Sequence, residues 1–260
     1  MKRIVSALAL AFLFVLPAVA EIAGADAPSP KASWRDDFSD PGVLRRDWKF
    51  DGSIFFVPRT KFYIGSDPTA SKGKMMVVDA KKATGVMLSA PSPVDLTKTP
   101  VMRWRWRVVK PVRVKAGKKD PDDQAVVVYF GDGTLLKQRC VGYRWDVNTP
   151  IGHSGCRNYA AGMMTVTHKT VRNRTTPVGK WVVEEHNVVE DYRKAYGKLP
   201  DSYFIISVGA NSQYSGSDTR AEVDYIEFIP EHKKAAKQKT APMEKVAEGK
   251  NVPSASPVGK

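Results

Sequence analysis

The middle of the chain alternates between apolar and basic side chains. Within residues 102–109, Met102, Trp104, Trp106 and Val108 fall on one side, and Arg103, Arg105 and Arg107 fall on the other. A period of two is the period of a β-strand. The segment therefore predicts a strand whose tryptophans face a core and whose arginines face away from it.

Short apolar runs separated by turn residues continue on both sides of this segment. The strands that they predict are residues 34–38, 54–57, 61–64, 75–79, 85–90, 124–130, 140–147, 163–168, 181–188, 204–210 and 221–229. Only residues 189–196 favour a helix, with Asp191 near the start and Gly197 as a C-terminal stop. This pattern indicates an all-β sandwich, and the lack of an internal sequence repeat argues against a propeller.

The first and last predicted strands favour a jelly roll. Residues 34–38 (WRDDF) open the domain and residues 223–228 (VDYIEF) close it. Jelly-roll sandwiches of the carbohydrate-binding and lectin type bring such ends together. We expect two antiparallel sheets, one of them concave, within residues 34–230.

The two ends of the chain do not have the composition of a packed fold. Lys2 and Arg3, a short apolar run over 4–16, and the small residues Ala18 and Ala20 form the pattern of a secretory signal peptide at residues 1–20. An uncleaved anchor is the alternative, although the run is shorter than the roughly 17 residues that span a bilayer. Residues 21–33 predict a linker. Residues 231–260, with seven Lys against three Glu, predict a disordered basic tail.

Charge and export together limit the expected partners. The formal net charge of +14 falls to +12 when Lys2 and Arg3 are removed with the signal peptide. A basic protein in the periplasm, or secreted, meets anionic envelope polymers, and nucleic acid is not an expected partner there. No later segment is apolar enough to span a membrane, so surface association would depend on the basic tail. We expect a monomer.

The sequence has two cysteines, Cys140 and Cys156. In an oxidising compartment a disulfide between them is the default expectation. It would close a loop of about 16 residues and stabilise the fold by about 3 kcal/mol. A metal-binding or nucleophilic cysteine is the alternative, but there is no CxxC spacing and no adjacent His.

Several segments resemble one bacterial family. They are PVMRWRWRV at 100–108, DDQ at 122–124 leading into VYF at 128–130, YRW at 143–145, Trp181 with Glu184 and Val188, EDYRKAYG at 190–197, and VDYI at 223–226. Their order and spacing resemble those of the bacterial domain of unknown function 3047 over most of residues 34–230. The resemblance implies an exported β-sandwich and implies no activity. That family tends to carry an Asp-rich loop before the last strand, where this chain has NSQYSGSD at 211–218, which argues against a carboxylate site there.

The three arginines of the alternating segment have two interpretations. Side chains on one face of a strand lie about 6.5–7 Å apart, so three guanidinium groups repel each other unless anions meet them. Acidic residues of the chain could supply those anions, the candidates being Asp122, Asp123 and Glu184. Alternatively, Arg103, Arg105 and Arg107 could bind the carboxylate, sulfate or phosphate groups of a ligand.

Aromatic residues near polar turns are a second set of candidates. Trp104 and Trp106 share the apolar face and are expected in the core. Tyr129, Tyr143 and Trp145 lie close to polar or glycine-rich turns. An aromatic ring can stack on the apolar face of a sugar while its polar tip stays wet. Ordinary packing inside the sandwich is the alternative.

Catalytic and metal sites have less support in the sequence. A glycosidase needs two carboxyl groups about 5–9.5 Å apart, which Asp123 and Glu184 would provide only if their strands adjoin. A polysaccharide lyase could use His153, Asn158 and Tyr159 near the arginines. The histidines lack the spacing of zinc ligands. Asp36, Asp37 and Asp224 could hold a structural calcium ion that joins the two ends of the domain, or could be ordinary turn and strand-end aspartates; no other cofactor is expected.

These observations favour an exported, non-catalytic protein that binds an anionic glycan or another acidic envelope polymer. Binding would combine stacking on Tyr129, Tyr143 or Trp145 with neutralisation of acid groups by the arginines of residues 102–109. A polysaccharide lyase or hydrolase that uses the concave face is the first alternative. An envelope scaffold, anchored by the basic tail, is the second.

Overall fold

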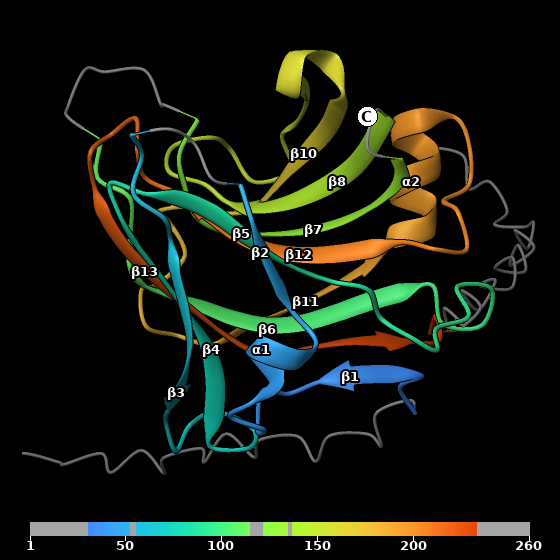
Figure 1. Cartoon of the computed structure of the whole chain (residues 1–260), viewed down its shortest axis with the longest axis horizontal. Helices are drawn as coiled ribbons and strands as arrows, with labels where there is room; N and C mark the ends of the chain where they lie inside the picture. The colour runs from blue at the N-terminus through green and yellow to red at the C-terminus, as the bar shows by residue number, and fades with distance from the viewer. Residues whose placement is uncertain (1–30, 53–55, 115–121, 135–136, 233–260) are drawn as a thin grey trace, which may run out of the picture.

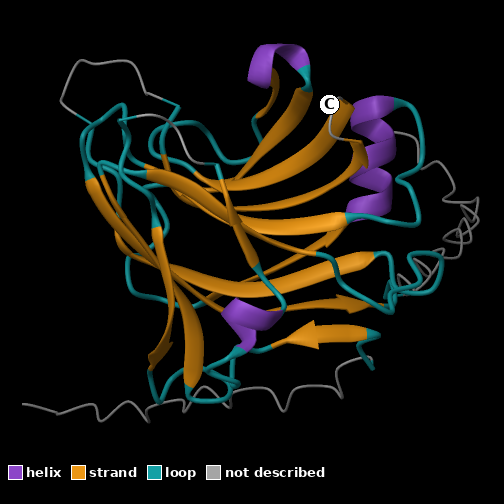
Figure 2. Cartoon of the chain, viewed as in Figure 1, coloured by secondary structure: helices purple, strands orange, loops and turns teal. Residues whose placement is uncertain are grey.

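The computed structural model describes residues 31–52, 56–114, 122–134 and 137–232, which form two packed β-sheets and two short α-helices (Figures 1 and 2). The expected signal peptide at 1–20, residues 21–30 of the expected linker and residues 233–260 of the expected tail lie outside the described residues. The expected all-β sandwich of the jelly-roll type is confirmed.

The first sheet has six strands and contains the alternating segment. Its order is β11 (Val182–Asn187), β6 (Val101–Lys110), β13 (Asp218–Ile229), β4 (Lys74–Lys81) and β3 (Lys61–Ser66), with β1 (Trp34–Asp36) paired to β13. The pairing of β1 with β13 is antiparallel and places Trp34 opposite Phe228. The first and last strands therefore lie side by side, as the sequence predicts.

The second sheet has seven strands and is curved. Its order is β2 (Lys49–Asp51), β5 (Thr84–Ser89), β12 (Ile205–Asn211), β7 (Gln124–Thr134), β8 (Lys137–Trp145), β10 (Met164–Arg172) and β9 (Ser154–Tyr159). β9 takes the edge beyond β10, so β10 returns parallel to β8, and the expectation of wholly antiparallel sheets is wrong for this pair. Figure 1 shows the strands curving away from the six-stranded sheet, so that the outer face is concave.

The core lies between the inner faces of the two sheets. Trp104 and Trp106 of β6 are fully buried, with ring centroids 5.5 Å apart in an edge-to-face arrangement. Trp106 also meets Trp145 of the other sheet, at 5.7 Å between ring centroids. The period-two prediction for the alternating segment is therefore correct for its apolar face.

The two α-helices are short, and α2 closes part of the core. α2 (Val188–Tyr196) covers the predicted helix, and α1 (Val43–Arg46) is a single turn. The side chain of Asn187 caps the N-terminus of α2 by accepting from Glu190 N–H at 3.0 Å. Gly197 ends it with φ 70°, which only glycine adopts at little cost. Within the described residues no helix is long and apolar enough to cross a membrane.

Candidate functional site

Carboxylates of β13 meet each arginine of the alternating segment. Arg103 Nε lies 2.5 Å from Glu227 Oε1, Arg105 Nη1 lies 2.5 Å from Asp224 Oδ2, and Arg107 Nε lies 2.6 Å from Glu222 Oε2. The register explains two of these pairs, since Glu227 and Glu222 stand directly opposite Arg103 and Arg107 on adjacent strands. A register shift between Val223 and Tyr225 makes Asp224 the extra residue that reaches Arg105.

Further contacts cover the same face. The side chains of Arg103, Arg105 and Arg107 are only 11%, 24% and 13% exposed to solvent. The guanidinium groups of Arg105 and Arg107 lie 4.8 and 4.2 Å from the centre of a Trp181 ring. Arg107 also pairs with Asp67. The structure therefore pairs the arginines internally, although not with Asp122, Asp123 or Glu184.

The three candidate aromatic residues do not share a surface. Tyr143 and Trp145 are buried and belong to the core, and the Tyr143 hydroxyl donates to Asp191 at 2.9 Å. Tyr129 of β7 stands opposite Gly142 of β8, so the pleat places it on the opposite face from Tyr143. Only Tyr129 lies on the concave outer face.

Cys140 and Cys156 are free thiols, so the expected disulfide is not formed. Strand β10 separates β8 from β9, which sets their backbones about 9.6 Å apart at two strand spacings, whereas a disulfide needs Cα atoms within about 7 Å. Cys140 pairs with Val166 and Cys156 with Thr167, and neighbouring residues on β10 point to opposite faces. Burial raises the pKa of the Cys140 thiol to about 12.

The three aspartates considered for calcium have protein partners of their own. Asp36 accepts from Trp48 Nε1 at 2.8 Å, and Asp37 lies 3.8 Å from Arg35. Asp224 is held by Arg105. No group of three or more His, Cys, Asp or Glu side chains within the described residues could hold a metal ion.

Five polar side chains gather on the concave face near β9. Their positions are Asp122 just before β7, Arg144 on β8, Arg157 and Tyr159 on β9, and His168 on β10; with Tyr129 we call them the concave cluster. The Tyr159 hydroxyl donates to Asp122 Oδ2 at 2.7 Å and lies 3.0 Å from His168 Nε2. The Asp122 carboxylate also forms ion pairs with Arg144 at 3.0 Å and with Arg157 at 3.5 Å.

The pleat and the register bring these residues to one face. Tyr129 stands opposite both Ser207 of β12 and Gly142 of β8, and His168 of β10 also stands opposite Gly142. A Cβ atom on Gly142 would lie 2.6 Å from the Tyr129 ring, so the ring lies over this glycine. The tyrosine therefore needs glycine at position 142.

Burial fixes the protonation of the cluster. Desolvation, reinforced by the charge of Arg144, lowers the pKa of His168 to about 4, so the imidazole is neutral at pH 7. Burial tends to raise the pKa of Asp122, but the hydrogen bond from Tyr159 and the nearby arginines outweigh it and lower that pKa. The cluster therefore holds one carboxylate, two guanidinium groups and a neutral His168.

Some polar groups of the concave face have no partner. Tyr159 has one proton, which goes to Asp122, so its oxygen accepts from His168 Nε2–H and leaves His168 Nδ1 as an acceptor. Nδ1 of His168 and Nε of Arg144 are buried without hydrogen bonds. Native proteins leave few buried polar atoms unpaired. Within the described part of the chain, the Tyr129 and Ser207 hydroxyls also bond to no other residue, but unlike those two nitrogens they are accessible to solvent. This face therefore has unused bonding capacity.

The sequence singled out three of the six residues of the concave cluster and did not place them together. Tyr129 and Tyr159 were candidates, but the expected companions of Tyr159, His153 and Asn158, are not in the cluster. Asp122 was expected to meet the arginines of β6, and it meets Arg144 and Arg157. His168 and Arg144 lie on predicted strands, but their alternation with apolar residues does not say which strands adjoin.

The fold and its concave polar face define a β-sandwich protein with a candidate ligand-binding surface. The sequence profile of the family "Protein of unknown function (DUF3047)" matches residues 57–227. The chain belongs to this family, as the resemblance of its motifs indicates. No curated protein matches the sequence.

Among solved structures, the chain is similar to the family 11 carbohydrate-binding module of a Clostridium thermocellum cellulase, at 13% identity, TM-score 0.41, and coverage of 80% of this chain and 99% of that chain. It is also similar to a carbohydrate esterase of the Shiga toxin-encoding bacteriophage phi24B, at 10% identity, TM-score 0.44, and coverage of 78% and 100%. A third is the xyloglucanase domain of a Sinorhizobium fredii effector, at 8% identity, TM-score 0.40, and coverage of 71% and 94%.

Proposed function

We propose that the concave face of the seven-stranded sheet binds an acidic glycan without transforming it. The unpartnered hydroxyls of Tyr129 and Ser207, next to the arginines of the concave cluster, carry this proposal. Sugars present many hydroxyl groups, and each can pair with such a side chain. The ring of Tyr129 adds an apolar surface for the sugar face.

The charges of the cluster favour an acidic ligand. Arg144 lies between two carboxylates, 3.0 Å from Asp122 and 3.7 Å from Asp146, so its charge is balanced within the protein, whereas Arg157 meets Asp122 at 3.5 Å from a position open to solvent. The Arg157 side chain is more than half exposed, so a carboxylate or sulfate group of a ligand can reach it. This assignment replaces the arginines of β6, which already have carboxylate partners.

Calorimetric titration with a uronate oligosaccharide and its neutral counterpart tests the proposal. We expect the uronate to bind more tightly, with an affinity that falls as salt rises. Tyr129→Phe removes only a hydroxyl and should weaken binding about 5-fold, the equivalent of about 1 kcal/mol. Tyr63→Phe, on the outer face of the other sheet, is the matched control and should leave affinity unchanged.

Removing the charge of Arg157 provides a second variant for the same titration. Arg157→Gln should weaken uronate binding and reduce its salt dependence, whereas Arg193→Gln on the exposed side of α2 should change neither. Failure of the uronate to bind, or equal binding of the neutral counterpart, would contradict the proposal.

A polysaccharide lyase needs a group that takes a proton from the sugar, and the cluster is poorly suited to this. Burial raises the pKa of Tyr159, so its phenol stays protonated. The free Nδ1 of His168 is buried away from solvent. Incubation with uronate polymers should therefore give no ultraviolet absorbance from unsaturated ends. A rise in that absorbance would establish the lyase instead.

We also propose that the protein acts outside the cytoplasm. The support is the signal-peptide pattern of residues 1–20 together with the basic charge of the chain. Cell fractionation should recover a mature form that begins at Glu21 in the periplasm or the medium. Recovery of the full-length chain in the cytoplasm would refute export.

A further inference from the structure

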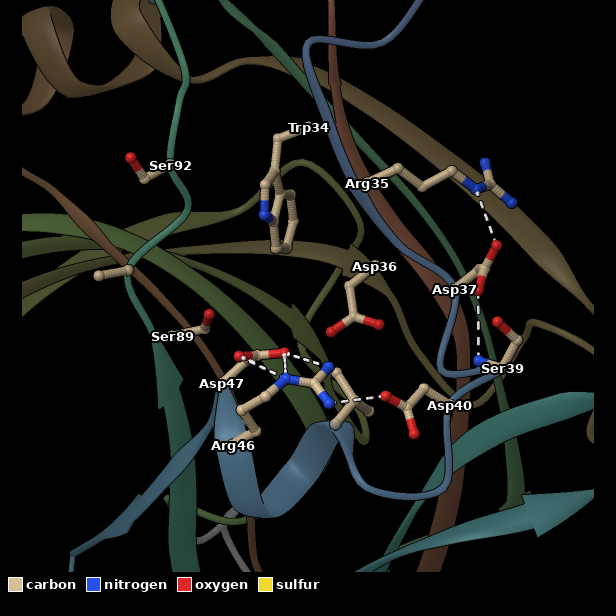
Figure 3. A pocket seen from close by; sticks show the side chains of 12 residues that line it. Trp34, Arg35, Asp36, Asp37, Ser39, Asp40, Arg46, Asp47, Ser89 and Ser92 are labelled. Atoms are coloured by element: carbon tan, nitrogen blue, oxygen red, sulfur yellow. Dashed lines mark hydrogen bonds and ion pairs between the residues drawn. The ribbon is translucent and has the colours of Figure 1, made fainter.

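A separate pocket of about 510 Å³ lies where β1 and the turn into α1 approach the end of β5 (Figure 3). Its lining includes Trp34, Asp36, Asp40, Arg46, Asp47 and Ser89. None of these residues belongs to the concave cluster. The pocket is therefore a second candidate site, independent of the proposed function.

The pocket is acidic although the protein is basic. Its wall carries four aspartates and two arginines. Arg46 is committed to two of those aspartates, lying 2.7 Å from Asp40 and 2.8 Å from Asp47. Arg35 lies 2.9 Å from Glu227 and 3.8 Å from Asp37. The pocket thus has an excess of negative charge.

Asp36 is the lining carboxylate that no cation balances. Within the described residues it has no ion pair, and it accepts instead from Trp48 Nε1 at 2.8 Å and Phe38 N–H at 2.9 Å. Burial raises the pKa of Asp36, the two hydrogen bonds oppose the shift, and the nearby charges of Asp37 and Asp47 add to it. A partly buried carboxylate in this state gains free energy from a proton or from a bound cation.

Ser89 supplies an independent sign of a ligand. Its side chain is only 6% exposed, lines the pocket, and has no hydrogen-bond partner among the described residues. Figure 3 shows Ser89, Trp34 and Asp36 around the same space. Because this hydroxyl opens onto the pocket and bonds to no other described residue, it is free to pair with a ligand there.

We propose that this pocket binds a small polyhydroxylated molecule that carries a primary ammonium group, of the amino-sugar class. An ammonium group has three donors and a full positive charge. Asp36 and Ser89 can accept from two of the donors, and the indole of Trp34 offers a face that attracts a cation. The pocket volume suits one or two sugar rings, and the remaining carboxylates can accept from sugar hydroxyls.

The experiment uses glucosamine, N-acetylglucosamine and glucose as probes of the intact protein, followed by NMR or calorimetry near pH 6, where the amine is protonated. Glucosamine should bind, and the two neutral sugars should bind at least about 10-fold more weakly, because they lack the charge that meets Asp36. Equal binding of all three sugars, or no binding of glucosamine, would overturn the proposal.

Two variants locate the site, and one serves as a control. Ser89→Ala removes a hydroxyl that bonds to no other described residue, so it should leave folding intact and weaken glucosamine binding about 5-fold. Asp36→Asn should abolish the preference for glucosamine, whereas Asp201→Asn, at an exposed aspartate outside the pocket, should not change it. If Ser89→Ala binds as tightly as the parent protein, the pocket is not the site.

The pH dependence of glucosamine affinity tests whether Asp36 contacts the amine or only supports the fold. Affinity for glucosamine should fall on acidification as Asp36 takes up a proton, at a pH above the ordinary value for aspartate, because its pKa is raised. The Tyr129→Phe variant should keep the full profile, which separates this site from the concave face. A profile without any loss on acidification would exclude Asp36 as the partner of the amine.

Discussion

Among the carboxylates that pair with the arginines of β6, Asp224, the partner of Arg105, is the most deeply buried. Asp224 is fully buried, and besides Arg105 it accepts from Ser71 N–H and from the Ser71 hydroxyl, each at 2.9 Å. Removing one partner of such a pair leaves an uncompensated charge away from water. The arginines of β6 therefore stabilise the sheet, whereas Arg157 on the concave face remains open to solvent.

Replacing Arg105 tests this distinction. Arg105→Met keeps much of the side-chain volume but leaves Asp224 without its cation, and it should lower the free energy of unfolding by about 3 kcal/mol. Lys98→Met removes the cation of an exposed pair with Asp95 and should change it by less than about 0.5 kcal/mol. Urea denaturation measures both values.

The same variant separates the two interpretations of the arginine stripe. Folded Arg105→Met protein should keep its affinity for the uronate oligosaccharide, because the concave face lies on the other sheet. A variant of unchanged stability that had lost this affinity would restore the arginines of β6 as ligand-binding residues.

At the scale of elements, the order of the strands decides what each side chain can meet. The period of two in residues 102–109 is enough to predict β6 and its buried tryptophans. It does not reveal the bulge that places Asp224 beside Arg105, because a bulge depends on the register between two distant strands. β9 was not predicted as a strand, since its sequence SGCRNY is mostly exposed at a sheet edge and has no apolar alternation.

In the candidate site too, the chemistry of single residues can be predicted from the sequence, whereas their grouping depends on strand order. Tyr129 could be proposed from its chemistry alone, and it does lie on the concave face. Tyr143 and Trp145 have the same chemistry, but Tyr129 stands opposite Gly142 on the next strand. Positions 143 and 145 therefore point to the other face, into the core. Asp122 meets Arg144 and Tyr159 only because β7, β8, β10 and β9 are neighbours in that order, which local sequence patterns do not encode.

The strand order also predicts the reactivity of the cysteines. Cys156 lies exposed on the edge strand β9, whereas Cys140 is less exposed and its sulfur lies beside Gly131 of the adjacent strand β7. A thiol reagent such as dithionitrobenzoate should titrate one thiol in the native protein and a second only after unfolding, because buried thiols react slowly. Cys156→Ser should remove the fast thiol and leave stability nearly unchanged.

A disulfide would give a different result. The native protein would then show no free thiol until it was reduced, and Cys156→Ser would lower the free energy of unfolding by about 2–5 kcal/mol. Cys140→Ser provides the matched variant, and it should remove only the thiol that appears on unfolding.

At the scale of the whole molecule, the folded unit extends beyond the part that matches the family. The match covers residues 57–227, yet β1, α1 and β2 precede it. Phe38, Val43 and Trp48 from this leading segment are buried in the same core as the tryptophans of β6. The segment also supplies β1 to one sheet and β2 to the other, so it connects the two layers along one edge.

A chain that begins at residue 57 should therefore not fold cooperatively. Loss of one large buried aromatic residue such as Trp48 costs about 3–5 kcal/mol, and removal of the whole segment would exceed the 5–15 kcal/mol that holds a typical domain together. A chain that begins at residue 31 is the control and should show a single thermal transition, followed by circular dichroism. A matching transition in the shorter chain would mean that residues 57–232 form the core alone. The leading segment would then serve mainly to line the acidic pocket beside β5.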